Sequence, residues 1–179
     1  DQGASPQFSI VASGENSAFP HHQTGSRKLK EGDAIVIDLG GRFERYTSDI
    51  TRMSTIGNPH KDYALVHQIV EDAICAALKA AIPGEIAKNI DKAAREAIEK
   101  EGFGKYFVHR TGHGLGTEIH EAPFITSSSE TILEPGMVFS IEPGIYMPGK
   151  FGVRLEEIVI LHDDGPEILS KIPRELKVI

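Results

Sequence analysis

The chain has 179 residues, a length typical of one domain that buries its own core. Its hydrophobic fraction of 40% and charged fraction of 25% exclude a disordered or collagen-like chain. The net charge of -7 argues against a nucleic-acid partner, because phosphate contacts require clustered lysines and arginines. No apolar run is long enough to span a bilayer, so we expect no membrane partner. Cys75 is the only cysteine, which excludes an internal disulfide and favours a reducing, cytoplasmic compartment.

The apolar pattern predicts strands in both halves of the chain and two helices between them. Pro83 and Gly84 separate the two helices, and Gly102 ends the second one. Cys75 lies in an alanine-rich run of the first helix, where we expect a small buried side chain. The expected elements are strands over residues 8–11, 34–41, 44–57, 104–109, 137–147 and 151–161, and helices over residues 61–81 and 85–101.

A weak internal duplication relates the two halves of the chain. Each half runs from a strand and a histidine-containing loop into a pair of strands that carry two carboxylates. In the second half two helices precede the histidine loop, whereas only a polar segment precedes Phe8. No low-complexity linker divides the chain, so we expect residues 1–179 to form one domain.

Two aspartates occupy positions where an apolar side chain would be expected. Asp38 interrupts the apolar run AIVIDLGG, where an ionised carboxylate costs several kcal/mol unless a partner compensates it. Asp49 lies on the following strand, and a hairpin could bring the two acids together. Adjacent carboxylates repel each other unless they share a proton or a cation. The alternative is that Asp38 caps a strand end and that Asp49 pairs with Arg52.

The same pattern recurs near the C-terminus. Glu142 ends the apolar run VFSI, and the neighbours Glu156 and Glu157 follow VRL. Strand alternation sends these two neighbours to opposite faces, but the pattern alone does not indicate which one faces inward. A local pairing of one of them with Arg154 is the alternative. Such a pairing would account for an acid on a single strand. It accounts less well for four acids that recur in two similar hairpins.

His113 adds an imidazole to these carboxylates, from a loop whose glycines permit close approach of the backbone. A donor set of several oxygens and one nitrogen suits two divalent ions such as Mn, Fe or Co better than a thiolate zinc site does. Calcium is a lesser rival, because no loop has the spacing of an EF-hand. The sequence therefore predicts a metal site between the two hairpins.

Five motifs together resemble those of the pita-bread metallopeptidases, the family of prolidase, aminopeptidase P and methionine aminopeptidase. They are VIDLGG, SDITR, HRTGHGLGTEIHEAP, IEPGIY and GVRLEE. They occur in this order, and the resemblance runs from about Phe8 to the C-terminus, nearly the whole chain. The resemblance implies an α+β fold in which a curved antiparallel sheet with pseudo-twofold symmetry is covered by helices. It selects Glu156 over Glu157. The ligands it implies for two divalent ions (Mn, Co, Fe or Zn) are Asp38, Asp49, His113, Glu142 and Glu156.

Within this family, SGENSAFPHH and GVRLEE are similar to the prolidase and aminopeptidase P branch. The resemblance implies that a water or hydroxide shared by the two ions hydrolyses the N-terminal Xaa-Pro bond of a dipeptide or short peptide. Some prolidases have a basic residue just after the HExP segment, where this chain has Phe124. This difference slightly favours an aminopeptidase P-like or broad activity over a dipeptidase. The alternatives are a methionine aminopeptidase-like enzyme, a non-catalytic pita-bread binding module and a cation-buffering domain.

The resemblance also assigns roles in catalysis. Glu142 is similar to the family residue that carries a proton from the attacking water to the leaving nitrogen. His21 and His120 match histidines that donate hydrogen bonds to the substrate or to the tetrahedral oxyanion. His22 competes with His21 for this role, although the resemblance favours His21.

His109 matches a substrate-contacting histidine, and Arg154 matches an arginine that steadies Glu156 or another carboxylate. For both residues a local structural pairing is an equal alternative.

Family members normally have two helices before the first strand and often a further N-terminal domain that helps them to oligomerise. We therefore expect this chain to be a C-terminal catalytic domain without its first helices, from a protein that is a homodimer at full length. A sheet without those helices would expose an apolar face. The chain alone should then aggregate or be covered by another chain.

Overall fold

The computed structural model describes residues 3–179, which form a mixture of helices and short and long strands. The helices are α1 (Tyr63–Ala80) and α2 (Ala87–Lys100), with the short 3-10 helices η1 (Gly14–Ala18) and η2 (Gly104–Tyr106). The strands are β1 (Ser5–Ser13), β2 (Ala34–Phe43), β3 (Tyr46–Thr55), β4 (Gly112–Gly114), β5 (Glu121–Ile125), β6 (Val138–Ile141), β7 (Gly144–Met147), β8 (Phe151–Arg154), β9 (Glu157–His162), β10 (Gly165–Ile168) and β11 (Lys177–Val178).

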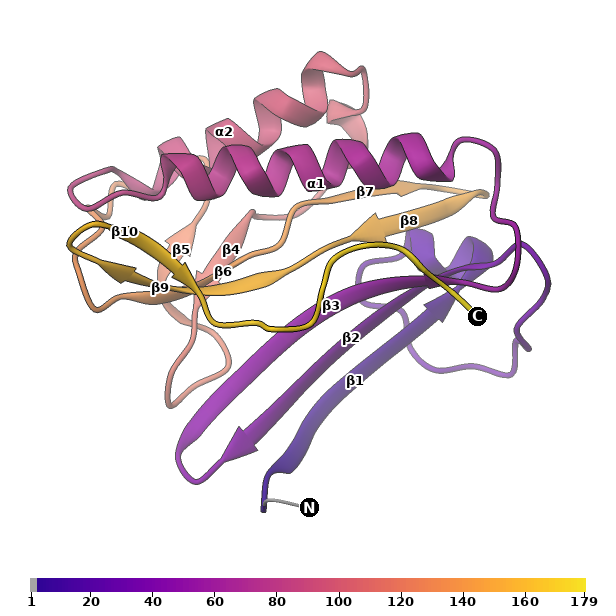
Figure 1. Cartoon of the computed structure of the whole chain (residues 1–179), viewed down its shortest axis with the longest axis horizontal. Coiled ribbons are helices and arrows are strands. Elements are labelled where there is room, and N and C mark those ends of the chain that lie inside the picture. The colour runs from indigo at the N-terminus through magenta and orange to yellow at the C-terminus, as the bar shows by residue number, and fades with distance from the viewer. Residues whose placement is uncertain (1–2) are drawn as a thin grey trace.

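These strands form three sheets, in which every pairing is antiparallel except the one between β11 and β3. One sheet has the order β1-β2-β3-β11, the second has the order β10-β9-β6-β4-β5, and β7 pairs with β8. Figure 1 shows α1 and α2 together on one side of the molecule, with β1, β2 and β3 on the opposite side. Antiparallel sheets with helices on one side confirm the α+β architecture that the sequence predicted.

The hydrophobic core lies between the helices and the sheets. Helix α1 turns one face inward, because its apolar residues recur every three or four positions. Helix α2 does the same with a narrower stripe. Helix α1 lies against α2 and against β6, β7 and β8, and α2 lies against β5 and η2. Ala34, Val36 and Met53, at the ends of β2 and β3 far from their connecting turn, belong to the same core. The buried helix residues of this core include Tyr63, Val66, Val70, Ala73, Ile74, Ile90, Ala94 and Ile98.

Two of the predicted strands are broken in the structure, and each break carries one of the predicted ligands. The strand expected over residues 137–147 divides into β6 and β7 around Glu142, because Pro143 has no N–H to continue the ladder. The strand expected over residues 151–161 divides into β8 and β9 around Glu156. At each break the glutamate N–H leaves its own sheet and donates to a distant carbonyl, that of Thr111 for Glu142 and that of Thr51 for Glu156.

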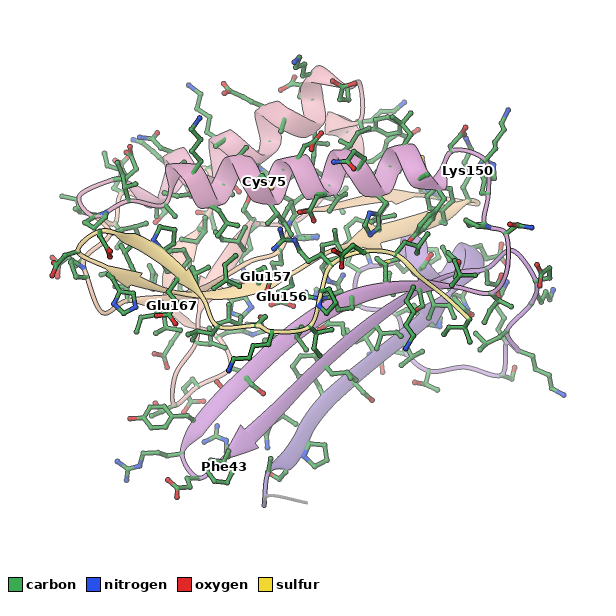
Figure 2. The ribbon with its side chains drawn as sticks, viewed as in Figure 1. Phe43, Cys75, Lys150, Glu156, Glu157 and Glu167 are labelled. Atoms are coloured by element: carbon green, nitrogen blue, oxygen red, sulfur yellow. The ribbon has the colours of Figure 1, made fainter. Side chains whose placement is uncertain are left out.

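Two further expectations about local structure were wrong. Residues 104–109 contain the short helix η2 rather than a strand, because i to i+3 hydrogen bonds from Tyr106 and Phe107 tighten the chain after Gly102. Cys75 is exposed rather than buried. It lies on α1 outside the buried stripe, with its thiol near the carboxylate of Glu71. Figure 2 labels Cys75 on this helix. The alanines around it do not make its own position buried.

The face of the β1–β2–β3 sheet opposite the predicted ligands carries apolar side chains. Val11 pairs with Ile37 across β1 and β2, and Leu39 pairs with Ile50 across β2 and β3. Val11 and Leu39 are exposed. The sequence predicted such an apolar face, and the association that it would drive stays a prediction. Within residues 3–179, no helix has the length and apolar character needed to cross a membrane.

Candidate metal centre

A cavity of about 950 Å³ lies between the β1–β2–β3 sheet and the second half of the chain. All the predicted ligands and the other predicted catalytic residues line it. They come from β2 and β3, from the segment after η1, from β4 and the loops on either side of it, from the end of β8, and from the two strand breaks. The lining side chains that carry charge or an imidazole are His21, His22, Asp38, Asp49, His109, Arg110, His113, His120, Glu142, Arg154 and Glu156.

The first two predicted ligands, Asp38 and Asp49, project from one face of the β2–β3 hairpin. Asp38 pairs with Thr51 in the register, and Gly40 pairs with Asp49, so the two aspartates are diagonal neighbours. Both are buried. Gly40 also leaves room for the ring of Phe8, because a Cβ at this position would overlap that ring. Burial, followed by the charges of Asp38 and Glu142, raises the pKa of Asp49 to about 8.

His113 on β4 presents one ring nitrogen to the acids. Its Nδ1 lies 3.1 Å from the carbonyl oxygen of Gly114, so the proton on Nδ1 can donate there and leave the lone pair on Nε2 free. His113 Nε2 lies 3.2 Å from Glu142 Oε1 and 3.9 Å from Asp49 Oδ2. Ser140 supports this arrangement, since its hydroxyl accepts from the His113 N–H and donates to Glu142. An imidazole in this tautomer is suited to bind a cation.

Glu156 enters the cavity, and its neighbour Glu157 faces away. Thr51 Oγ1 donates to Glu156 Oε2 at 2.8 Å, while Glu157 forms ion pairs with Arg52 and Arg174, each at 2.9 Å. Figure 2 labels both glutamates beneath helix α1. Glu156 therefore occupies the inward position, and Arg52 pairs with Glu157 rather than with Asp49.

The pKa values of the acids differ because they share a buried site. Burial, followed by the charges of Asp49, Glu142 and Asp38, raises the pKa of Glu156. Burial is the largest single effect on Glu142 and would raise its pKa, but the hydrogen bond from His113 and the positive charges of His109, His113 and Arg154 together lower the pKa. Burial is therefore the main cause of the raised pKa values of Asp49 and Glu156, and the neighbouring carboxylates add to it.

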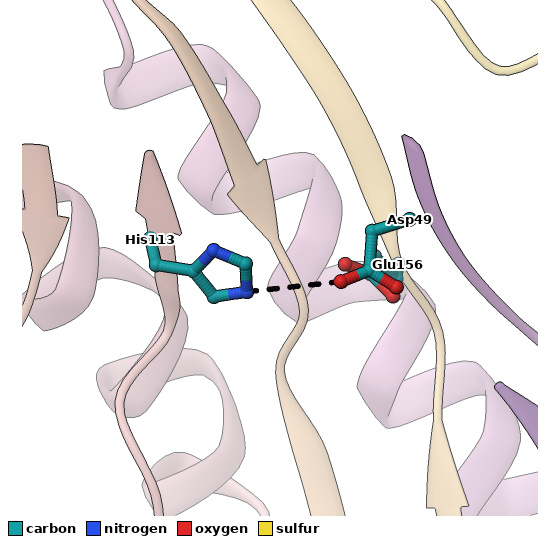
Figure 3. A group of neighbouring side chains, drawn as sticks. All are labelled: Asp49, His113 and Glu156. Carbon is teal, nitrogen blue, oxygen red and sulfur yellow. Dashed lines mark ion pairs between the residues drawn. The ribbon is translucent and has the colours of Figure 1, made fainter. Parts of the chain in front are cut away.

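The residues present fit a divalent cation. Asp38 Oδ1, Asp49 Oδ1 and Glu156 Oε1 are buried and have no hydrogen-bond partner among residues 3–179. One potential ligand atom from each of Asp49, His113 and Glu156 lies within 4.8 Å of the others. Figure 3 shows the His113 ring pointing toward the carboxylates of Asp49 and Glu156. Unpaired buried carboxylate oxygens are costly unless a cation binds them. Oxygen-rich sites with one imidazole favour divalent metals of the Mn and Co type.

Arg154 connects Asp38 to a chain of hydrogen bonds. Its guanidinium is buried and donates to Asp38 Oδ2 at 2.6 Å and to the Tyr146 hydroxyl at 2.7 Å. Tyr146 in turn lies 2.8 Å from His109 Nε2. Burial lowers the pKa of His109, so the neutral ring can accept from Tyr146 while its Nδ1 proton donates to the carbonyl of Arg110. Arg154 thus pairs with Asp38, and within residues 3–179 it forms no hydrogen bond or ion pair with Glu156.

His120, His21 and His22 complete the imidazoles of the cavity. The rings of His120 and His113 meet edge to face with their centroids 4.2 Å apart. Burial, followed by the charges of His113 and Arg110, lowers the pKa of His120. His21 is exposed and His22 is half-buried, and both line the cavity. The geometry leaves both available to contact a bound substrate.

Three supporting residues escaped the sequence analysis. Tyr146 looked like an ordinary core aromatic in a strand, and Thr51 like an ordinary strand residue. Asp91 is a fully buried acid on the apolar stripe of α2, and it accepts hydrogen bonds from Thr111 N and Thr111 Oγ1. An acid within a helical apolar stripe was a signal that could have identified Asp91.

Comparison with known proteins places this geometry in a family. Residues 2–163 match the family model described as Metallopeptidase family M24. The chain is 46% identical over 172 residues to the Xaa-Pro dipeptidase of Pyrococcus furiosus, covering 96% of this chain and 49% of that protein. It is 46% identical over 173 residues to the probable dipeptidase PepE of Mycobacterium tuberculosis, covering 96% of this chain and 46% of that protein.

Solved structures give the same result. The X-Pro aminopeptidase of Thermotoga maritima superposes with a TM-score of 0.93 at 46% identity, covering 96% of this chain and 49% of that chain. For the Xaa-Pro dipeptidase of Bacillus anthracis the TM-score is 0.97 at 41% identity, covering 99% of this chain and 51% of that chain. The chain spans about half the length of these relatives. On the family match, the identities and the shared fold, this chain belongs to metallopeptidase family M24.

Proposed function

We propose that the protein with this chain hydrolyses the N-terminal Xaa-Pro bond of dipeptides or short peptides, and that two divalent ions bind in the cavity. One observation carries the proposal: the predicted ligands converge from both halves of the chain, and three of their buried oxygens have no partner among residues 3–179. Four carboxylates and an imidazole offer more donor atoms than the roughly six that one such ion coordinates. Relatives named Xaa-Pro dipeptidase and X-Pro aminopeptidase support the substrate class.

The side chains of the cavity have distinct roles in this proposal. Divalent cations held by Asp38, Asp49, His113, Glu142 and Glu156 would polarise the scissile carbonyl. They would also lower the pKa of water, so that hydroxide is available near neutral pH to attack this carbonyl. Glu142 accepts the proton of the attacking water and delivers it to the leaving nitrogen. His120 and His21 donate hydrogen bonds to the oxyanion of the tetrahedral intermediate.

Arg154 and His109 act through Tyr146. The hydrogen bonds of Arg154 fix one oxygen of Asp38, which leaves the other oxygen directed at the cation site. His109 holds the Tyr146 hydroxyl in place by accepting a hydrogen bond from it at Nε2. We therefore assign Arg154 and His109 to the support of Asp38.

The cavity also suits the proline side of the bond. The nitrogen of an Xaa-Pro bond is tertiary and has no N–H. The enzyme therefore needs space for the proline ring, and no hydrogen-bond acceptor for an N–H at this position. Apolar side chains of Phe8, Ile10, Pro20 and Ile119 line the cavity beside the acids and offer such a surface. The homodimer of the full-length protein and its cytoplasmic location stay predictions.

The first test removes and restores the metal. Chelated and dialysed protein should contain no divalent metal by elemental analysis and should not cleave Ala-Pro or Ala-Pro-Ala. Addition of Mn or Co should restore cleavage of at least one of them. Cleavage at the full rate by metal-depleted protein would contradict the proposal.

The second test compares neighbouring glutamates. Glu156→Gln should abolish binding of the second equivalent of metal and reduce the rate by a factor of about 100 or more, because an amide cannot replace a buried anionic ligand. Glu157→Gln is the matched control, since Glu157 faces its arginine partners outside the cavity. Equal metal content in the two variants would count against Glu156 as a ligand.

A further inference from the structure

Only two side chains with a permanent positive charge line the cavity, among residues 3–179, and they are Arg154 and Arg110. Arg154 is buried, and its guanidinium already donates hydrogen bonds to Asp38, Tyr146 and Thr51. Arg110 is half-buried and forms no ion pair or side-chain hydrogen bond with residues 3–179. A cation in a cavity rich in carboxylates would normally be paired with one of them. Arg110 is therefore the one cavity arginine that remains available to a bound anion.

Phe124 holds this guanidinium in place. The Cζ atom of Arg110 lies 5.1 Å from the centroid of the Phe124 ring, a cation–π arrangement. Phe124 on β5 is the register partner of His113 on β4, and directly opposed residues of an antiparallel pair share one face of the sheet. The ring, and the guanidinium over it, therefore lie on the same side of the sheet as the ligand His113.

We propose that Arg110 binds the C-terminal carboxylate of a dipeptide substrate. In a dipeptide this carboxylate is attached to the Cα next to the scissile nitrogen, so it must lie close to the reacting carbonyl. The acids of the cavity repel a further carboxylate, and Arg154 is buried with four of its five N–H groups already donating, to Thr51, Pro20, Tyr146 and Asp38. A guanidinium can form two parallel hydrogen bonds to a carboxylate. This inference rests on the proposed peptidase function and names the form of its substrate.

The proposal changes the significance of Phe124. The absence of a basic residue at position 124 favoured an aminopeptidase P-like or broad activity. The structure instead gives position 124 an aromatic ring that orients a cation supplied from position 110. A dipeptide can then be selected without a basic residue at position 124.

The test measures binding as well as turnover, with the full chain loaded with Mn. The ligands are an uncleavable Ala-Pro analogue, in which a methylene replaces the scissile carbonyl, and its C-terminal amide. Calorimetry should show that the wild type binds the acid about 10- to 100-fold more tightly than the amide, the range expected for hydrogen bonds between charged groups. In Arg110→Gln the ratio should fall to about 1, and Arg110→Lys should restore part of it.

Two further variants complete the experiment. Arg45→Gln is the matched control, because Arg45 is an exposed arginine in the turn between β2 and β3, and its acid-to-amide ratio should equal that of the wild type. Phe124→Ala should lower the ratio by loosening the guanidinium. A third analogue, whose only carboxylate is the side chain of an Asp residue, tests whether Arg110 binds a side-chain carboxylate instead of the C-terminal one. Loss of affinity in Arg110→Gln for this ligand alone would overturn the proposal.

The two proposals fail in different ways. If Mn-loaded wild type does not hydrolyse Ala-Pro or Ala-Pro-Ala, the peptidase function is wrong. If Arg110→Gln keeps the acid-to-amide ratio of the wild type, or if the wild type binds both analogues equally or neither, the role of Arg110 is wrong. A folded Arg110→Lys protein keeps the test valid if Arg110→Gln does not fold.

Discussion

Replacement of Asp91 by alanine should destabilise the loop that carries His109 and His113. Asp91 is fully buried on α2, and its Oδ1 accepts from Thr111 N at 3.1 Å and from Thr111 Oγ1 at 2.8 Å. Its Oδ2 pairs with Arg95 at 2.7 Å, and Arg95 donates to the carbonyls of Phe107 and His109. One carboxylate thus connects α2 to the chain on both sides of His109.

The expected loss is about 3 kcal/mol of unfolding free energy. Asp91→Ala leaves two donors of Thr111 without an acceptor, and each buried donor of this kind costs about 1–3 kcal/mol. The side chain of Arg95 is 33% exposed, so its charge can reach water and adds little to the loss. For a chain of this size the midpoint of thermal unfolding should fall by about 6–12 °C.

The assay is thermal unfolding of the metal-free protein, together with Mn affinity. Mn affinity should fall as well, because the Thr111 carbonyl accepts from the Glu142 N–H and lies two residues before His113. Glu96→Ala is the control on the same helix, since Glu96 is exposed and its pair with Lys92 spans 3.7 Å, and it should change stability by less than about 0.5 kcal/mol. If Asp91→Ala shifts the midpoint no more than Glu96→Ala does, the argument from buried donors is refuted.

Three other predictions concern the Tyr146 hydroxyl, the Arg27–Asp33 ion pair and the binding of Mn. Tyr146→Phe should lower turnover on Ala-Pro and leave Mn content unchanged, because it removes the hydroxyl between Arg154 and His109 without touching a proposed ligand; loss of Mn would assign Tyr146 a larger role. Hydrogen bonds from Arg27 are the main cause that lowers the pKa of Asp33 below its ordinary value of 3.8, so this pair stabilises the fold above that pH and its contribution is lost as the pH falls through the folded-state pKa. In Asp33→Asn the free energy of unfolding, measured in urea at a series of pH values, should change less over this range than in the wild type. A pH dependence parallel to that of the wild type would contradict this prediction. Addition of Mn at 100 times its dissociation constant should stabilise the wild type by about 2.7 kcal/mol, as measured by urea unfolding, and no change would exclude binding specific to the folded state.

The proposed ligand acids stand out in the sequence because they interrupt its local apolar pattern. Asp38 stands among β-branched residues, and such a carboxylate requires a partner wherever the strand lies in the fold. The choice between Glu156 and Glu157 could not be made from alternation alone. In the structure it depends on Arg174, which pairs with Glu157 after the chain has passed through β9 and β10. No local pattern contains that contact.

Other features were missed for physical reasons of the same kind. Tyr146 has the hydrophobicity of a core residue, and only the position of its hydroxyl between two polar side chains reveals its role. The breaks at Glu142 and Glu156 interrupt runs that are apolar on both sides, because tertiary hydrogen bonds to Thr111 and Thr51 replace the ladder. Cys75 was placed in the core from the composition of its helix, although its angular position on that helix decides its exposure.

The division of the ligands between the two halves has a consequence for the whole molecule. Asp38 and Asp49 come from the β2–β3 hairpin, and the other proposed ligands come from segments more than fifty residues further along the chain. A cation shared by these groups would be a non-covalent cross-link that closes a long loop, so a chelator should act as a selective denaturant. The junction between the halves would then tighten or loosen with the concentration of available metal.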